Sequence, residues 1–360
     1  MKGYAKPLHE FIEGHKIQFV IPVYQRNYDW LIDNCDQLFS DLVKLSRSNR
    51  CSHFFGSIVT SSADSSYNRL VIDGQQRLTT ISLLLLAGIK AVKVGAIEIS
   101  EESKIDEAYE VFLKAKFCNS ERKIKLVPIE NDRIAYDKIF NEEDSFDEDS
   151  KVTRNYRHFY NLLTRKPQAL SFDQLLDAIE RLQIISIELD SDDDAQLIFE
   201  SLNSTGLALT EADKIRNYLL MSLTPEEQHM CFKNYWQKIE QATENQPTKF
   251  LRDYLTIQQQ LQRPVRQSNI YYEWKKYMDG HERKEELVRM LDYAHYYQQV
   301  TEAKLSTAKL CEKMRHICNI ETDVTNVFFI QFLKYASANC LSGSNDRAIG
   351  EDHIHQRANC

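Results

Sequence analysis

The sequence predicts an α+β fold in which a small mixed sheet with flanking helices is followed by a mainly α-helical domain. Two observations support this prediction. Runs rich in β-branched and aromatic residues alternate with helical patterns up to Asp190, and apolar residues then recur at helical spacing from Asp192 to about Tyr335. The chain also contains only 10 Gly and 7 Pro among 360 residues, so few positions would interrupt a helix.

The first strands are expected in separate segments of the chain. The run "KIQFVIPVY" (16–24) has the composition of a strand and is broken near its end by Pro22. A helix is expected at 30–45, where apolar residues have helical spacing. The runs "HFFGSIVTSS" (53–62) and "NRLVID" (68–73) flank the turn-forming stretch "ADSSY", which predicts a hairpin.

A second strand pair is expected farther along the chain. Its members would be "RKIKLVPIE" (122–130) and "LQIISIELD" (182–190), which are again rich in β-branched residues. The acidic stretch "NEEDSFDEDS" (141–150) between them is expected to be an exposed loop. Since helical segments interrupt the strands, the sheet must be assembled from distant parts of the chain.

Three parts of the chain are expected. Residues 1–223 would form the domain that contains the sheet, residues 224–340 a helical domain, and residues 341–360 a tail without apolar periodicity. The boundary is placed near Leu223 because "SLTPEEQ" ends one helix and begins another at Pro225.

Charge and cysteine content restrict the class of protein. The formal net charge of −8 argues against a uniformly basic DNA-binding surface, although 116–126 and 262–277 are locally basic. Each basic segment is either solvated surface or a nucleic-acid contact.

The eight scattered cysteines lack a C-x-x-C pair and are expected to be reduced thiols. Without a signal peptide or a run long enough to span a bilayer, the protein is expected in the cytoplasm with no membrane partner.

In "RLVIDGQQRLTT" a strand runs into a glycine turn and directly into a helix. The start of a helix presents unpaired N–H groups and partial positive charge, which suits an anion. Arg77 would add donors for phosphate, and Gly74 would let the backbone approach it. Gln75 and Gln76 would orient a base, a ribose or a water, and Asp73 would hold a metal or a ribose hydroxyl. An ordinary helix start with Asp73 as the N-cap explains the same pattern.

A second polar cluster lies in "LNSTG", directly before a predicted helix. Thr210 and Asp213 fit a capping box, so that helix is expected to begin at Glu211. The amide, hydroxyls and glycine of the preceding turn would suit a phosphate or sugar cradle, or simply connect two helices. These cradle residues are Asn203, Ser204, Thr205 and Gly206.

A third cluster, "IPVYQRNYDW", follows the first predicted strand. It places Tyr24, Tyr28 and Trp30 among Gln25 and Arg26. Aromatic rings beside an arginine would stack on a base or shape a pocket. Alternatively, the aromatic residues seat the following helix on the sheet, which leaves the Gln-Arg pair unexplained.

Four motifs occur in the same order and at similar separations in one known family. They are "IPVYQRNYDW", "HFFGSIV", "VIDGQQRLTT" and "FESLNSTGLALTEADKIRNYLL". The chain resembles the N-terminal domain of GmrSD-type restriction endonucleases over about 11–223, and more loosely to about Tyr335. This resemblance implies a ParB/sulfiredoxin-like fold and makes residues 1–223 a nucleotide-binding domain.

The resemblance also implies roles for the motif residues. Asp73, Gly74, Gln75, Gln76 and Arg77 would form the centre that binds and hydrolyses a nucleoside triphosphate, with Mg²⁺ held through Asp73. Tyr24, Gln25 and Arg26 would lie beside this pocket, as in relatives that sense modified DNA. The turn Asn203–Gly206 would close it from the other side.

Two functions are then compatible with the chain. The first is an NTP-hydrolysing subunit, with GTP the expected nucleotide, of a type IV-like restriction system that acts on modified phage DNA. Such relatives often carry an HNH nuclease domain, but only five residues follow His355 here, so the nuclease is expected on a separate chain or in a part missing by truncation. The alternative is a non-catalytic sensor of nucleotide or DNA with the same fold.

Overall fold

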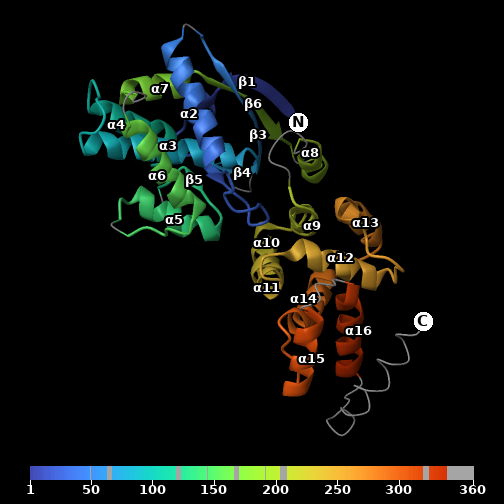
Figure 1. Cartoon of the computed structure of the whole chain (residues 1–360). Helices are drawn as coiled ribbons and strands as arrows, with labels where there is room; N and C mark the ends of the chain where they lie inside the picture. The colour runs from blue at the N-terminus through green and yellow to red at the C-terminus, as the bar shows by residue number, and fades with distance from the viewer. Residues whose placement is uncertain are drawn as a thin grey trace. The chain divides into compact units, whose positions relative to one another are not determined.

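The computed structural model describes residues 1–48, 50–62, 67–118, 123–143, 145–165, 170–190, 192–202, 209–318 and 324–338. The chain forms two compact units, Met1–Ala208 and Leu209–Cys360. The first contains the sheet and the second is helical (Figure 1), so the predicted α+β class is confirmed. The ParB/sulfiredoxin-like assignment remains a prediction. The predicted domain boundary near Leu223 lies inside the second unit, which begins at Leu209.

Six strands in the described residues form one mixed sheet. They are β1 (Lys2–Pro7), β2 (Gln18–Val20), β3 (His53–Ser62), β4 (Asn68–Asp73), β5 (Leu126–Val127) and β6 (Leu182–Leu189). The order across the sheet is β1-β6-β3-β4-β2-β5. The pairs β1–β6 and β3–β4 are antiparallel, whereas β3–β6, β2–β4 and β2–β5 are parallel.

The strand predictions are confirmed in part. The expected hairpin is present, since β3 and β4 pair antiparallel. The second expected pair is wrong, because β6 lies between β1 and β3 while the two-residue β5 pairs with β2 at the opposite edge. Composition marks a segment as a strand but does not select its neighbour. The strand expected at 16–24 is limited to β2, since the chain turns after Pro22, whose carbonyl accepts a hydrogen bond from Gln25 N at 3.0 Å.

Helices accompany the sheet in the first unit. The expected helix at 30–45 is confirmed by α2 (Ile32–Arg47). The acidic stretch 141–150 is largely exposed in its described residues, as predicted. The other helical elements of this unit are α1 (Leu8–Ile12), α3 (Gln75–Lys93), α4 (Ser103–Ala108), η1 (Tyr109–Leu113), α5 (Glu130–Phe140), α6 (Lys151–Thr164), α7 (Phe172–Glu180) and α8 (Ala195–Leu202).

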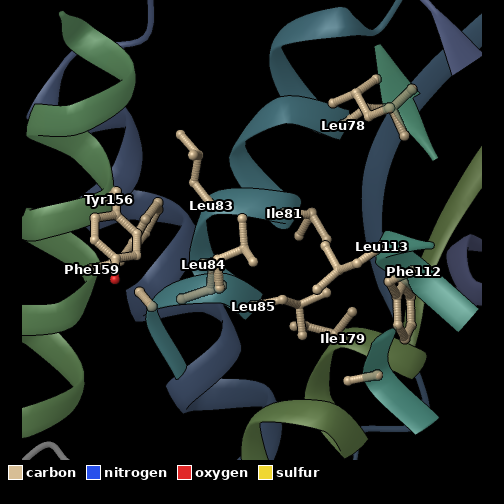
Figure 2. Packing of buried hydrophobic residues seen from close by; sticks show 14 of the residues in the cluster. Leu78, Ile81, Leu83, Leu84, Leu85, Phe112, Leu113, Tyr156, Phe159 and Ile179 are labelled. Atoms are coloured by element: carbon tan, nitrogen blue, oxygen red, sulfur yellow. The ribbon is translucent and has the colours of Figure 1, made fainter. Parts of the chain in front are cut away.

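Helix α3 is the centre of the hydrophobic core. Its side chains are buried on all sides, which identifies a helix enclosed by protein. Figure 2 shows Leu84 on the side of Phe159 of α6, and Leu85 on the side of Ile179 of α7. Each fully buried leucine contributes about 2 kcal/mol of hydrophobic stabilisation. The core therefore fixes α3, and with it the polar residues at its N-terminus.

The second unit is helical throughout its described residues. As predicted, α9 (Glu211–Leu220) begins after a capping box of Thr210 and Asp213, and α10 (Pro225–Cys231) begins at Pro225. The remaining elements are η3 (Phe232–Trp236), α11 (Gln237–Ala242), α12 (Pro247–Gln258), η4 (Gln267–Asn269), α13 (Ile270–Tyr277), α14 (Arg283–Thr301), α15 (Ala308–Cys318) and α16 (Val324–Ala338).

Three further features bear on the class of protein. No helix among the described residues is both long and apolar enough to span a membrane. The cysteines within the described ranges are free thiols. The predicted tail, which contains His353 and His355, lies outside the described residues.

Candidate functional site

The candidate site is built at the junction of β4 and α3. Gly74 joins them with φ 97, in the left-handed region, and is itself the N-cap of the helix. A Cβ at this position would lie 3.0 Å from Ile58 Cγ1 and 3.2 Å from Ile58 Cα in β3, so both the backbone conformation and the space favour glycine. The alternative with Asp73 as the N-cap is therefore wrong. As a glycine, Gly74 contributes no side-chain hydrogen bond to the first turn of α3.

Asp73 and Arg77 flank this helix start as a loose ion pair. They are one helical turn apart, and Arg77 Nη1 lies 3.6 Å from Asp73 Oδ2. The same nitrogen donates a hydrogen bond of 2.7 Å to the carbonyl of Ser57 in β3. Each side chain is about a fifth exposed, at 20% for Asp73 and 21% for Arg77. The hydrogen bond to Ser57 thus positions Arg77, and both charged side chains remain partly exposed.

Gly56 provides the space in which Arg77 lies. The pairing of β3 with β6 shifts register between Phe54 and Gly56, and Gly56 has φ 115. A Cβ at Gly56 would lie 2.7 Å from Arg77 Nε and 3.0 Å from Arg77 Cζ. Gly56 is not among the site residues predicted from the sequence, although a glycine inside a strand pattern indicates a bulge or a close approach of another group.

Gln75 binds the turn that follows β2. Its Nε2 donates to the carbonyl of Arg26 at 3.1 Å and to Gln25 Oε1 at 3.3 Å. Gln25 Nε2 in turn donates to the carbonyl of Ile72 in β4 at 2.8 Å. Both amide side chains are buried. The two predicted motifs are therefore joined by side-chain hydrogen bonds.

Gln76 holds the next part of the same loop. Its Oε1 accepts hydrogen bonds from Asp29 N at 2.8 Å and Trp30 N at 3.3 Å, and its Nε2 donates to the carbonyl of Asn27 at 3.2 Å. Gln76 is buried as well. Its amide therefore anchors the backbone of residues 27–30. The expected role of Gln76 in orienting a base, a ribose or a water stays a prediction.

Tyr28 fastens the loop from within. Its hydroxyl lies 2.8 Å from Thr80 Oγ1 of α3 and accepts a hydrogen bond of 3.0 Å from Asn155 Nδ2 of α6. Its backbone N–H donates to Asp132 Oδ2 of α5 at 2.6 Å. Three helices, α3, α5 and α6, thus fix this one aromatic residue of the loop.

Burial raises the pKa of the Asp132 carboxyl from 3.8 to about 6. The hydrogen bond from Tyr28 N opposes this rise, and the nearby charge of Asp29 adds to it. A partly protonated carboxyl at neutral pH is therefore part of the structure that supports the loop.

The outer side of the loop carries a charged group. Arg26 Nη1 lies 3.8 Å from Asp29 Oδ2, and Lys151 at the start of α6 forms an ion pair with Asp29 Oδ1. Arg26 is largely shielded, with 14% of its side chain exposed. Tyr24 is fully buried, and burial raises the pKa of its hydroxyl, so this phenol stays neutral.

The other predicted group cannot be placed. Asn203, Ser204, Thr205 and Gly206 lie outside the described residues. Helix α8, which leads into them, lies near β4, the strand that ends at Asp73. Within the described ranges, no group of three or more His, Cys, Asp and Glu side chains is arranged to hold a metal ion.

Comparison with models of protein families gives a match to this chain. A family model described as "GmrSD restriction endonuclease, N-terminal domain" matches residues 8–220, more than half of the chain. The match includes every residue assigned to the site above. No curated protein matches the chain.

Proposed function

The chain belongs to the GmrSD restriction endonuclease N-terminal domain family, and from this premise we propose that it hydrolyses nucleoside triphosphates at the β4–α3 junction. Membership of the family implies a role in a restriction system that acts against modified DNA. Within such a system, the chain would be the specificity subunit that couples nucleotide turnover to DNA recognition. The observation that carries the proposal is the start of α3 at a glycine N-cap, between the charges of Asp73 and Arg77.

The helix start would receive the phosphates. Because Gly74 contributes no capping side chain, the first N–H groups of α3 are available to an anion. Arg77 adds a guanidinium that Ser57 and Gly56 already position. Arg26 would supply a second positive charge from the loop that Gln75 holds against β4. Phosphate oxygens would replace carboxylates as the partners of these two arginines.

The junction suits Mg²⁺ bound together with a nucleotide. Asp73 is a partly exposed carboxylate, and its 3.6 Å ion pair leaves it able to coordinate a cation. Mg²⁺ usually takes one or two carboxylates and completes its shell with phosphate oxygens and water, so the absence of a three-acid cluster among the described residues fits this mode. When bound, the ion would neutralise charge that develops on the phosphates.

Hydrolysis would then depend on positioning and charge stabilisation. Arg77 stabilises the transferred phosphoryl group, and Asp73 holds the metal or takes a proton from the attacking water. Gln75 and Gln76 act as positioning residues, since their hydrogen bonds fix residues 26–30 beside the junction. GTP is the nucleotide we expect.

The proposed partners follow from the same role. Modified DNA would be recognised near Tyr24, Gln25 and Arg26, which adjoin the nucleotide site. The turn Asn203–Gly206 would close over the nucleotide. An HNH nuclease partner would cut the DNA that this subunit selects.

One observation favours a second function. The side-chain amides of Gln75 and Gln76 are hydrogen-bonded to the neighbouring loop. Among the described residues of the junction, these contacts leave no side chain assigned to orienting the attacking water. The same pocket would then bind a nucleotide without turnover and act as a sensor.

A pair of measurements separates these functions. Binding of each of the four ribonucleoside triphosphates is measured by calorimetry, and phosphate release is measured under the same conditions with Mg²⁺ and with EDTA. Steady release that requires Mg²⁺ supports the enzyme. Saturable nucleotide binding without phosphate release supports the sensor. Absence of both binding and release would refute both proposed functions.

A further inference from the structure

The basic segment 262–277 of the second unit takes no part in the site described above. It contains four basic residues and one acidic residue, a net charge of +3 in a chain whose net charge is −8. Arg263 and Arg266 are exposed in the loop that leads into α13, and Lys275 and Lys276 are exposed in its last turn. The positive charge of this segment is therefore presented to solvent.

Helix α13 is firmly anchored on its other face. Ile270 and Trp274 are fully buried, and Trp274 packs against Tyr254 with ring centroids 6.3 Å apart. Tyr271 N donates a hydrogen bond of 2.8 Å to Glu211 Oε2 of α9. A buried face of this kind holds the exposed lysines on a rigid element.

Two tyrosine rings of α13 lie beside its exposed lysine ammonium groups. Lys276 Nζ lies 4.1 Å from the centroid of the Tyr272 ring and 3.2 Å from Glu273 Oε1. Lys275 Nζ lies 5.4 Å from the centroid of the Tyr271 ring. Tyr272 is 59% exposed, but the ammonium group of Lys276 already lies over its ring. This arrangement suits contact with phosphate better than stacking on an unpaired base.

We propose that Arg263, Arg266, Lys275 and Lys276 form a surface that contacts the phosphate backbone of duplex DNA. This inference rests on the proposed function for its choice of polyanion, but it concerns the second unit and not the nucleotide site. Contacts to phosphate position a protein on DNA without reading sequence. The surface would therefore bind unmodified and modified duplexes alike and leave discrimination to other residues.

The expected signature is a salt dependence of binding. Each phosphate contact contributes about 0.9 to the slope of log K against log salt concentration. If all four cations contact phosphates, replacing them makes that slope shallower by about 3 to 4. The loss should be equal for modified and unmodified DNA, because every duplex carries the same backbone.

The test uses the full chain and a fluorescein-labelled duplex of about two helical turns, with ordinary or hydroxymethylated cytosine. Fluorescence anisotropy is measured over a salt series for the wild type and for a variant with Ser at positions 263, 266, 275 and 276. A second variant exchanges Arg and Lys at the same positions and keeps the charge. The matched control carries Ser at the exposed positions of Lys304, Lys309, Lys313 and Arg315 in and before α15.

We expect the Ser variant alone to show a salt slope shallower by about 3 to 4 and to bind both duplexes at least about tenfold more weakly. The charge-keeping variant and the α15 control should bind like the wild type. Equal loss in the α15 control, an unchanged Ser variant, or a wild type that binds neither duplex would overturn it. Phosphate release without DNA is recorded for all variants, so failure of the nucleotide proposal is seen separately from failure of this one.

Discussion

The guanidinium of Arg77 lies directly against Gly56, where a Cβ would approach Arg77 Nε to 2.7 Å. The same arginine donates to the carbonyl of Ser57, the next residue along the bulged strand β3. The β3 bulge and the start of α3 thus form one structure. The position of the arginine depends on the neighbouring strand as well as on its own helix.

We predict that Gly56→Ala impairs phosphate release by displacing Arg77. The new methyl group would lie too close to the guanidinium of Arg77 and must push it aside. In addition, φ 115 at this position is a strained conformation for alanine. The matched control is Gly95→Ala, because Gly95 has φ 69 but nothing within 4 Å of its Cβ position. Both variants should lose about 1 kcal/mol or more of stability from backbone strain. Only Gly56→Ala should lose activity, and equal activity in the two variants would refute the role of Gly56.

Replacing Gln76 should loosen the loop at residues 27–30. In Gln76→Ala, the N–H groups of Asp29 and Trp30 and the carbonyl of Asn27 lose their partner, at a cost of about 2 to 3 kcal/mol. Urea unfolding measures this loss, and hydrogen exchange at the amides of Asp29 and Trp30 should become faster.

The control for this prediction is Gln37→Ala on α2. Gln37 donates only to Asp41 on the exposed face of that helix, so its loss should cost less than about 0.5 kcal/mol. If Gln76→Ala were no more destabilising than Gln37→Ala, Gln76 would not be an anchor of the loop.

Asp132 should make stability depend on pH. Its carboxyl has a pKa of about 6 when folded and 3.8 as the reference value, so the folded state binds this proton more tightly. The resulting stabilisation is fully present below pH 3.8 and is lost as the pH rises through about 6. The loss is about 3 kcal/mol by pH 7.

Asp132→Asn isolates this effect. The amide oxygen still accepts the hydrogen bond from Tyr28 N but does not ionise. The variant should therefore gain stability relative to the wild type between pH 4 and pH 7, as measured by urea unfolding across that range. A constant difference between the two proteins would show that Asp132 does not titrate in this way.

The sequence identifies those elements whose signals are local. The capping box of Thr210 and Asp213 and the proline at position 225 fix helix starts through neighbouring residues, and both starts are confirmed. The hairpin of β3 and β4 is predictable for the same reason, since only five residues separate its two strands in the sequence. Strand β1 carries no such signal, because its side chains are mostly exposed and show no apolar alternation.

The site is less predictable because its contacts are long-range. The sequence predicts a helix start with Arg77 in its first turn, and the structure confirms that placement. The anchors of Gln76 are backbone atoms some way back along the chain, from Asn27 to Trp30, and a backbone atom leaves no trace in the residue type. The support from Asp132 likewise comes from another helix.

The most direct test of the account is steady-state phosphate release from GTP with Mg²⁺ by the wild type, Asp73→Asn and Arg77→Ala. The control is Arg69→Ala. Arg69 lies in β4, the strand that ends at Asp73, and forms an ion pair with Glu188 away from the junction. We predict phosphate release by the wild type and the control, and at least about a hundredfold less release by both junction variants. Undiminished release by Arg77→Ala in a folded protein would contradict it.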